Sequence, residues 1–336
     1  MPQPPVRTVD YHTGGEPFRI VAEPPVPIRG ETVADRRVFA TADPAVDGLR
    51  RMLCFEPRGH ADMYGGFLTP PDDDGAALGV LFWHKDGFST ACGHGTMALG
   101  VWAVESGLVA AEPTGVTEVP VDVPSGRVTA RVHAVDGRVD FVNVPSWAVA
   151  EAVPVQTARG EVLADIAYGG ALYAHVEAAT LGLSVTPGDL DGLIAAGRET
   201  KWALNDSPYA RHPDDDRLGG IYGTILYDDL GTDPHGNPHH RNVTIFADGQ
   251  VDRSPCGSGT ASRVAMLNAT GRLPDDHYLI HDSIVGSRFT ARIERHLSLN
   301  GRQAVIPVVT GTAHKTGEHL FTIDPTDELF PGFVLR

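Results

Sequence analysis

Two cysteines lie in matching glycine-rich segments, and these segments are where the sequence could do chemistry. Residues 92–96 and 256–260 both have the form Cys-Gly-x-Gly-Thr, with four of five positions identical. Each segment is followed by an apolar stretch that ends at a glycine, Gly107 or Gly271, which is typical of a buried helix with a glycine stop. The sequence therefore predicts a thiol at the N-terminus of a helix twice in one chain.

A thiol in that position is a candidate base. A helix N-terminus presents unpaired N–H groups and the positive end of the helix dipole, so it binds anions and favours thiolate over thiol. Cys92 and Cys256 would then be opposed bases facing a carboxylate held between two helix ends. The alternative is two buried structural cysteines, because free cysteine is among the most buried residue types. The repeat favours the catalytic interpretation. Cys54 has no flanking glycine, and we predict that it belongs to the core.

Composition narrows the class of protein. The 336 residues are 42% hydrophobic and 21% charged, which is typical of a folded globular chain. The net charge of −16 argues against nucleic acid and anionic membranes as partners. Residues 1–5 have neither the basic nor the apolar region of a signal peptide, and no apolar run approaches the roughly 18 residues of a membrane span, so we expect a cytoplasmic protein. Three widely spaced cysteines make a disulfide framework or a structural zinc site improbable.

The elements that must position the thiols form an α+β class rather than a doubly wound sheet. Alternating apolar residues predict a β-hairpin over 128–141, with its turn at Asp136-Gly137, and another over 289–309, with its turn at Asn300-Gly301. Pro307 in the second hairpin indicates an edge position. Helices are predicted from Asp43-Pro44 towards Leu53 and from Thr186-Pro187 towards Trp202.

Two features of the loops complete the organisation. A domain boundary is plausible between Pro145 and Pro154, because the stretch between these prolines has no clean periodicity. The acidic loops 70–75 and 206–217 are interpreted as solvated surface, with cation binding by their aspartates as the alternative.

Further motifs resemble, in the same order along nearly the whole chain, those of the proline racemase family. This family includes proline racemases, 4-hydroxyproline 2-epimerases and trans-3-hydroxyproline dehydratases. The resemblance implies a diaminopimelate-epimerase-like α+β fold of two β-rich lobes, each around a central helix, with the active site between the lobes. It implies a first lobe of residues 1–150 plus about 325–336 that carries Cys92, a second lobe of 151–324 that carries Cys256, and neither cofactor nor metal. The motifs occupy residues 10–17, 57–65, 92–96, 165–170, 252–260 and 283–287.

The same resemblance implies roles for individual residues. Cys92 and Cys256 would be the two bases, one on each face of the substrate α-carbon. Asp252 and His94 would bind the ring amine. Alternatively, Asp252 is an acid of a surface loop or a charge at the start of a helix, and His94 only makes a hydrogen bond that satisfies a backbone group. The backbone amides that would hold the carboxylate belong to Gly93, His94, Gly257 and Ser258.

The choice of reaction depends on the second thiol. In family members that dehydrate trans-3-hydroxyproline the second cysteine is typically threonine, whereas racemases and epimerases keep both thiols, because inversion needs a base on one face and an acid on the other. This chain has both, although residues 78–82, 165–171 and 212–226 look more like the dehydratase branch. We therefore predict stereoinversion at Cα of proline or hydroxyproline, with dehydration of trans-3-hydroxy-L-proline as the alternative.

Three other classes of protein are alternatives to a cofactor-independent racemase. A pyridoxal-phosphate racemase needs a Schiff-base lysine, but none of the three lysines lies in a phosphate-binding glycine loop. A metalloenzyme could use His235, His239 and His240, although no H-E-x-x-H helix is present. A non-catalytic protein that binds proline analogues is the alternative outside enzymology. A homodimer is expected only from the general frequency of two-fold assemblies.

Overall fold

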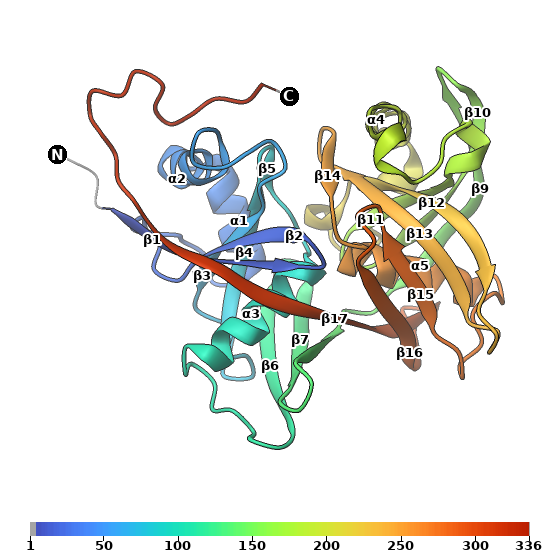
Figure 1. The fold of residues 1–336 in the computed structure, drawn as a ribbon, viewed down its shortest axis with the longest axis horizontal. Coiled ribbons are helices and arrows are strands. Elements are labelled where there is room, and N and C mark those ends of the chain that lie inside the picture. Colours follow the sequence, from blue (N-terminus) through green and yellow to red (C-terminus); the bar gives the residue numbers. More distant parts are fainter. Residues whose placement is uncertain (1–4, 336) are drawn as a thin grey trace.

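The computed structural model describes residues 5–335, which form a β-rich α+β fold (Figure 1). Residues 1–4, part of the segment from which the absence of a leader was predicted, and residue 336, the last of the predicted first lobe, lie outside the described part. The elements up to residue 142 are β1 (Val6–Thr13), β2 (Glu16–Val21), α1 (Val33–Ala42), α2 (Pro44–Cys54), β3 (Gly65–Thr69), β4 (Leu78–His84), β5 (Gly87–Phe88), α3 (Gly93–Glu105), β6 (Val116–Val123), β7 (Gly126–His133) and β8 (Arg138–Val142).

The remaining elements include four short 3₁₀ turns, η1 (Ala178–Leu181), η2 (Pro187–Asp189), η3 (Pro208–Ala210) and η4 (Asp216–Leu218). The strands and α-helices are β9 (Trp147–Thr157), β10 (Gly160–Tyr168), β11 (Leu172–Glu177), α4 (Leu190–Asn205), β12 (Ile221–Thr232), β13 (Pro238–Phe246), β14 (Gln250–Asp252), α5 (Gly257–Ala269), β15 (Leu279–Ser283), β16 (Arg288–Leu299) and β17 (Arg302–Phe321).

Eight strand pairings close a ring of strands around α3. The order is β1–β2–β3–β4–β6–β7–β8–β17, and β17 pairs again with β1. Helix α3 packs against β1, β2, β6, β7, β8 and β17. Its residues 93–100 are all buried, as expected of a helix that is apolar or small on every side.

A second ring surrounds α5. It runs β9–β10–β11–β12–β13–β15–β16–β17, and an isolated bridge between Ser146 and Val305 connects β17 to the start of β9. Helix α5 packs against β9, β10, β11, β16 and β17. Strand β17 is therefore shared: its first half pairs with β16, its middle with β8 and its second half with β1, so it runs from one ring into the other (Figure 1).

Both predicted hairpins are confirmed. β7 and β8 pair across the Asp136-Gly137 turn, and β16 and β17 pair across Asn300-Gly301 with Leu299 opposite Arg302. The edge position of Pro307 is wrong, because β17 pairs on both sides. Pro307 is tolerated there because it lies at an irregularity of the β16 register, where Ile293 faces Pro307 and Arg295 already faces Ile306, and such bulges accept a residue without an N–H.

Both predicted helix starts are confirmed in position. Asp43 caps α2, with its side chain accepting hydrogen bonds from the amides of Ala45 and Val46. Thr186-Pro187 opens η2, which leads into α4, but the Thr186 side chain makes no capping bond. The stop glycines also behave as predicted: Gly107 and Gly271 follow α3 and α5 with φ of 76° and 68°, the left-handed conformation common at helix ends.

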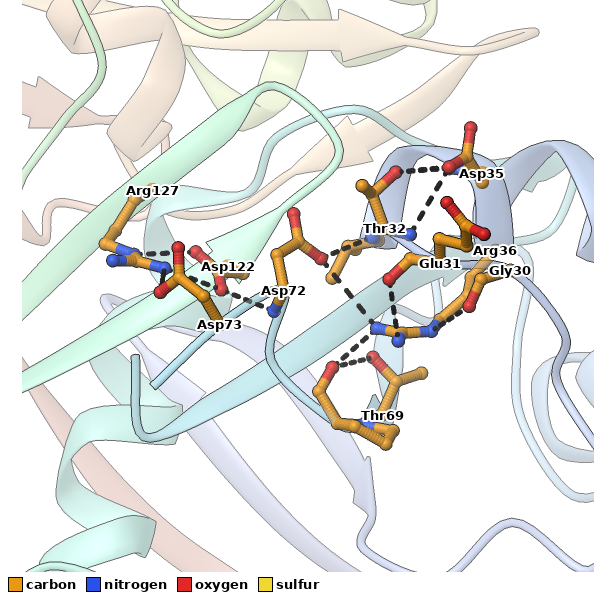
Figure 2. Close-up of polar contacts among 12 residues, drawn as sticks. Gly30, Glu31, Thr32, Asp35, Arg36, Thr69, Asp72, Asp73, Asp122 and Arg127 are labelled. Carbon is orange, nitrogen blue, oxygen red and sulfur yellow. Dashed lines mark hydrogen bonds and ion pairs between the residues drawn. The ribbon is translucent and has the colours of Figure 1, made fainter. Parts of the chain in front are cut away.

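The acidic loops are held by ion pairs and helix caps. In loop 70–75, Asp72 accepts a hydrogen bond from the amide of Val33 at 2.6 Å, and Asp73 and Asp122 both bind the guanidinium of Arg127 (Figure 2). Among residues 5–335 no group of three or more His, Cys, Asp or Glu side chains is arranged to hold a metal ion. No helix in the described part of the chain is long and apolar enough to cross a membrane.

Candidate active site

One small pocket, called the thiol pocket here, collects every predicted site residue. Its free volume is about 10 Å³, close to the space of one water molecule. Seven of its lining residues are those predicted from sequence: Cys92, Gly93, His94, Asp252, Cys256, Gly257 and Ser258. The other six were not predicted: Tyr64, Ala91, Tyr173, Tyr222, Thr244 and Phe246.

The two thiols stand at the N-termini of α3 and α5 in different backbone conformations. Cys92 is extended, and its Sγ accepts a hydrogen bond from the Gly95 amide at 3.2 Å. Cys256 has φ 65° and ψ 105° and makes no side-chain cap, and its own amide donates to Ser254 Oγ at 3.0 Å. Positive φ is unusual for a residue with a side chain and is found at functional sites. The repeated sequence thus has two geometries.

The two glycines of each segment are needed for different steric reasons. A Cβ on Gly93 would lie 2.6 Å from the Cα of Gly257, and a Cβ on Gly257 would lie 2.6 Å from the Cα of Gly93, so the two helix ends touch through bare backbone. A Cβ on Gly95 would lie 2.8 Å from Cys92 Sγ, and one on Gly259 would lie 2.9 Å from Cys256 Sγ. The first glycine of each segment brings the helices together. The second leaves room for the sulfur and for an apolar neighbour, Phe18 at Gly95 and Ile225 at Gly259.

The expected lowering of the thiol pKa values is wrong for these buried groups. Burial raises the pKa of Cys92 well above its usual range, and the negative charges of Asp252 and Glu16 add to this, while the Gly95 amide opposes it. Burial likewise raises the pKa of Cys256, again helped by Asp252. Desolvation outweighs the helix N-terminus because the charged form loses its water. A thiolate in this pocket needs a cation beside it.

Cys54 is a core residue, as predicted. It is fully buried at the end of α2, and its Sγ lies 3.4 Å from the carbonyl oxygen of Met63. Burial raises its pKa to about 12. This thiol therefore stays protonated and lies apart from the thiol pocket.

His94 is a neutral imidazole beside the first thiol. Burial lowers its pKa to about 3, opposed only in part by a hydrogen bond to the Pro17 backbone. Its Nδ1 lies 3.4 Å from Cys92 Sγ, and its ring packs edge-on against Tyr64 at 5.0 Å between centroids. His94 thus contributes a hydrogen-bonding nitrogen rather than a positive charge. It makes both the backbone contact that was the alternative prediction and the contact with the thiol.

Asp252 is a buried acid at the end of β14 and not a surface loop residue. Only 3% of it is exposed. Its Oδ1 accepts hydrogen bonds from the amide of Ser254 at 2.8 Å and from Ser254 Oγ at 2.7 Å. Burial raises its pKa to about 6, against the lowering effect of these bonds. Near neutral pH it therefore places a negative charge at the pocket wall.

Three tyrosines form the part of the pocket that sequence reasoning missed. The hydroxyl oxygens of Tyr64 and Tyr222 lie 3.0 Å apart, and the Tyr173 hydroxyl lies 2.7 Å from Ser258 Oγ. Burial raises the pKa of all three, so they act as neutral hydrogen-bonding groups. Tyr64 lies inside the family-like motif 57–65, and Tyr222 lies inside the stretch 212–226 that resembles the dehydratase branch. Their position in these segments was the sequence feature that pointed to the site.

The residues of the rival classes lie elsewhere. His239 Nε2 pairs with Asp282 at 2.7 Å, and the ring of buried His240 packs 5.3 Å from that of Tyr227. None of the three lysines lines the thiol pocket within the described part of the chain.

Known proteins resemble this chain over its whole length. A family model described as proline racemase matches residues 8–334. A trans-3-hydroxy-L-proline dehydratase from Burkholderia cenocepacia and a 3-hydroxyproline 2-epimerase from Burkholderia multivorans are each 43% identical over 335 residues, covering 98% of this chain and 98% of each relative. The crystal structure of a hydroxyproline epimerase from Agrobacterium vitis with bound trans-4-OH-L-proline matches with a TM-score of 0.90 at 32% identity, covering 100% of this chain and 97% of that one.

A more distant match concerns the fold alone. A phenazine biosynthesis protein of the PhzF family from Bacillus anthracis reaches a TM-score of 0.59 at 10% identity, covering 95% of this chain and 99% of that one. The motifs, the two-ring fold and the match over residues 8–334 agree with one another, and the chain belongs to the proline racemase family.

Proposed function

We propose that the protein inverts the configuration at Cα of a hydroxyproline or of proline, using Cys92 and Cys256 as the two acid–base groups. The observation that carries the proposal is that both thiols line one pocket and stand at the ends of two touching helices. Inversion needs a proton acceptor on one face of the α-carbon and a donor on the other. The resemblance to a 3-hydroxyproline 2-epimerase and to a hydroxyproline epimerase supports a hydroxylated proline as substrate.

In each turnover one thiolate removes the α-proton, so that the Cα–H bond breaks and an S–H bond forms. The electron pair of the broken bond passes into the carboxylate as an enediolate. The opposite thiol then gives its proton to the other face of Cα and becomes the thiolate. No net proton is gained or lost, and the two sulfurs have exchanged roles.

The helix ends supply the stabilisation that this step requires. Charge builds on the carboxylate oxygens in the transition state, and backbone amides aimed at such oxygens are worth roughly 3 kcal/mol each. The proposed donors are the amides of Gly93, His94, Gly257 and Ser258. Both copies of the repeat place these amides at a helix N-terminus, where they have no partner within the helix.

The ring amine of the substrate would be the cation that the thiols lack. Asp252 is proposed to bind this ammonium, with His94 as a second hydrogen-bonding partner. An ammonium between Asp252 and the sulfurs lowers the energy of a thiolate, which burial otherwise disfavours. Substrate binding would therefore generate the reactive ionisation state.

We further propose that the two strand rings are two lobes that close on the substrate. The first lobe comprises residues 1–150 plus about 325–336 and the second residues 151–324, with β17 as the strand common to both. An amino acid is larger than the present free volume of the thiol pocket, so its admission requires the lobes to separate. No cofactor enters this mechanism. A cytoplasmic location and a homodimer remain predictions.

Dehydration of trans-3-hydroxy-L-proline is the second candidate. It is favoured by the relative of that name from Burkholderia cenocepacia, which is 43% identical. In this reaction one thiolate takes the α-proton, and the C3–O bond breaks to release the hydroxyl as water after an acid protonates it. The enamine product then tautomerises to a pyrroline. One thiol suffices for proton removal.

The two candidates are separated by incubation in deuterium oxide with L-proline, trans-4-hydroxy-L-proline and trans-3-hydroxy-L-proline. Wild type is expected to give α-deuteration with inversion, and Cys92→Ser and Cys256→Ser are each expected to lose inversion by at least about 10²-fold, in the range of general acid–base catalysis. Optical rotation, deuterium content and pyrroline formation are measured together. Full inversion by Cys256→Ser would overturn the two-thiol scheme, and pyrroline formation without inversion by wild type would establish the dehydratase.

A further inference from the structure

A second cavity, called the outer pocket here, adjoins the thiol pocket and has a free volume of about 290 Å³. Tyr222 lines both pockets. The outer pocket is built from both parts of the fold, with Arg37 on α1 and His84 on β4 from one and Lys201 and Trp202 on α4 from the other.

Two cations in the outer pocket lack a carboxylate partner. Lys201 is only 7% exposed, and its Nζ lies 3.7 Å from the ring centroid of Trp202. Arg37 donates to the backbone carbonyls of Phe88 at 2.9 Å and Arg217 at 3.1 Å. Within residues 5–335, no Asp or Glu oxygen pairs with either group within 4.0 Å. Lys201 is buried and Arg37 is half-buried. Because buried cations are normally paired, the charge of Lys201, with that of Arg37 beside it, is available to an anion.

Two acids, Asp86 and Asp248, also line the outer pocket, and both are occupied by other partners. Asp86 pairs with Lys85 at 2.7 Å and accepts the backbone amide of Asp248 at 3.0 Å. Asp248 in turn binds the side chains of Arg198 at 2.8 Å and Trp202 at 3.0 Å. Because the two acids bind these other groups, they neutralise the positive charges of Lys201 and Arg37 only in part.

His84 adds a neutral donor to this set. Its Nδ1 accepts the amide of Asp86 at 3.1 Å, so the proton of the neutral ring sits on Nε2. Burial lowers the pKa of His84 to about 3, which keeps the ring neutral. An ammonium, a guanidinium and an imidazole N–H thus line one cavity.

We propose that the outer pocket is a carboxylate-binding site that receives the amino-acid substrate before it passes Tyr222 into the thiol pocket. This inference rests on the proposed function, because the substrate is taken to carry a carboxylate. In a chain of net charge −16, a small anion is repelled over most of the surface, and a cavity that holds two cations without a carboxylate partner attracts it locally. The hydroxyl contact between Tyr64 and Tyr222, 3.0 Å long, is the barrier that opens between the pockets.

Binding is tested first, without catalysis, by titrating sodium acetate against the full chain at constant ionic strength and following tryptophan fluorescence. Trp202 lines the outer pocket, so occupancy is expected to change its emission, and Trp202→Phe is expected to remove that change. Lys201→Met, which keeps the length of the side chain and removes the charge, is expected to weaken acetate binding about tenfold. No acetate response in wild type overturns the proposal, whether or not the protein proves to be an epimerase.

The uptake role is tested by kinetics with the substrate identified above. Lys201→Met and Arg37→Met are each expected to raise KM about tenfold with kcat unchanged, within the range by which charge steering alters association. Lys201→Arg is expected to restore KM. The matched control is Lys315→Met, which removes the same charge from β17, where Lys315 pairs with Glu318, and should leave KM unchanged.

Two results would contradict the uptake role. If Lys201→Met loses acetate binding but keeps the wild-type KM, the pocket holds a free anion unrelated to the substrate. If kcat falls with KM unchanged, Lys201 acts on the thiol pocket and not on uptake.

Discussion

The second glycine of each Cys-Gly-x-Gly-Thr segment provides space for the preceding sulfur and for one apolar side chain beside it. Gly95 and Gly259 do this at equivalent places, although Cys92 and Cys256 differ in backbone conformation. The position of each thiol is therefore determined by main-chain packing as well as by its own rotamer. Space for sulfur is a local requirement, and a local motif can encode it.

Gly95→Ala and Gly259→Ala are expected to destabilise the fold and to impair catalysis. At Gly95 the added Cβ would meet the Phe18 ring and lie 2.8 Å from Cys92 Sγ, and at Gly259 it would lie 2.8 Å from Ile225 Cδ1 and 2.9 Å from Cys256 Sγ. Overpacking of this kind costs about 1–3 kcal/mol. Urea denaturation and kcat are the measurements. Gly48→Ala is the control, because nothing lies within 4 Å of its added Cβ in helix α2, and there alanine should stabilise by about 0.5–1 kcal/mol. Unchanged kcat in both site variants would contradict this account of the glycines.

The thiols were predictable from sequence and the tyrosines were not, for a physical reason. Cys92 and Cys256 lie inside short contiguous motifs, and the spacing within each motif predicts where the helix begins. Tyr64, Tyr173 and Tyr222 come from three separate places, just before β3, on β11 and on β12. They meet only because the strand order brings these segments together, and no local pattern contains that order.

At the scale of elements, helix α1 shows how loops far apart in the sequence fix one helix end. Thr32 and Asp35 form a reciprocal capping box, and Asp72 from the acidic loop accepts the amide of Val33 (Figure 2). The acidic composition of this loop predicts solvated surface and gives no sign of its contact with α1. Because α1 carries Arg37, the cap also holds one wall of the outer pocket.

Thr32→Ala is expected to lower the free energy of unfolding by about 1 kcal/mol, the usual cost of losing an N-cap side chain. Thermal or urea denaturation measures it. Thr41→Ala in the same helix is the matched control, since the exposed Thr41 hydroxyl only donates to the carbonyl of Arg37. Equal losses from the two variants would show that the cap contributes nothing specific.

Element prediction succeeded where the determinants were local. The two hairpins follow from alternation and from Asp-Gly and Asn-Gly turns, and the helix starts follow from Asp43-Pro44 and Thr186-Pro187. Pro307 was misjudged because a proline in a strand admits two explanations, an edge or a bulge. The partner strand decides between them, and that strand is β8, which lies well over a hundred residues earlier.

At the scale of the whole molecule, β17 belongs to both rings and connects their cores. Val308 lies in its middle, fully buried, opposite Arg292 of β16 and Val142 of β8. Neither ring can lose this strand without opening the other. The molecule should therefore behave as one cooperative unit although it has two central helices.

Val308→Ala is accordingly expected to destabilise both rings together by about 2 kcal/mol, from lost burial and the cavity left behind. Hydrogen–deuterium exchange under mild denaturant measures this, because amides of β4 and β13 should lose protection by the same amount. Val135→Ala, in the exposed turn before β8 and 84% accessible, should change neither. Loss of protection in one ring alone would contradict a shared unit.

The reciprocal contact between Gly93 and Gly257 constrains substitution at both positions. Residue i of one copy touches residue j of the other and the reverse holds as well, which is the signature of a two-fold interface between identical subunits. Within one polypeptide this contact couples the two segments of the repeat. A side chain added at either glycine would press on the backbone of its counterpart, so neither position accepts bulk independently of the other.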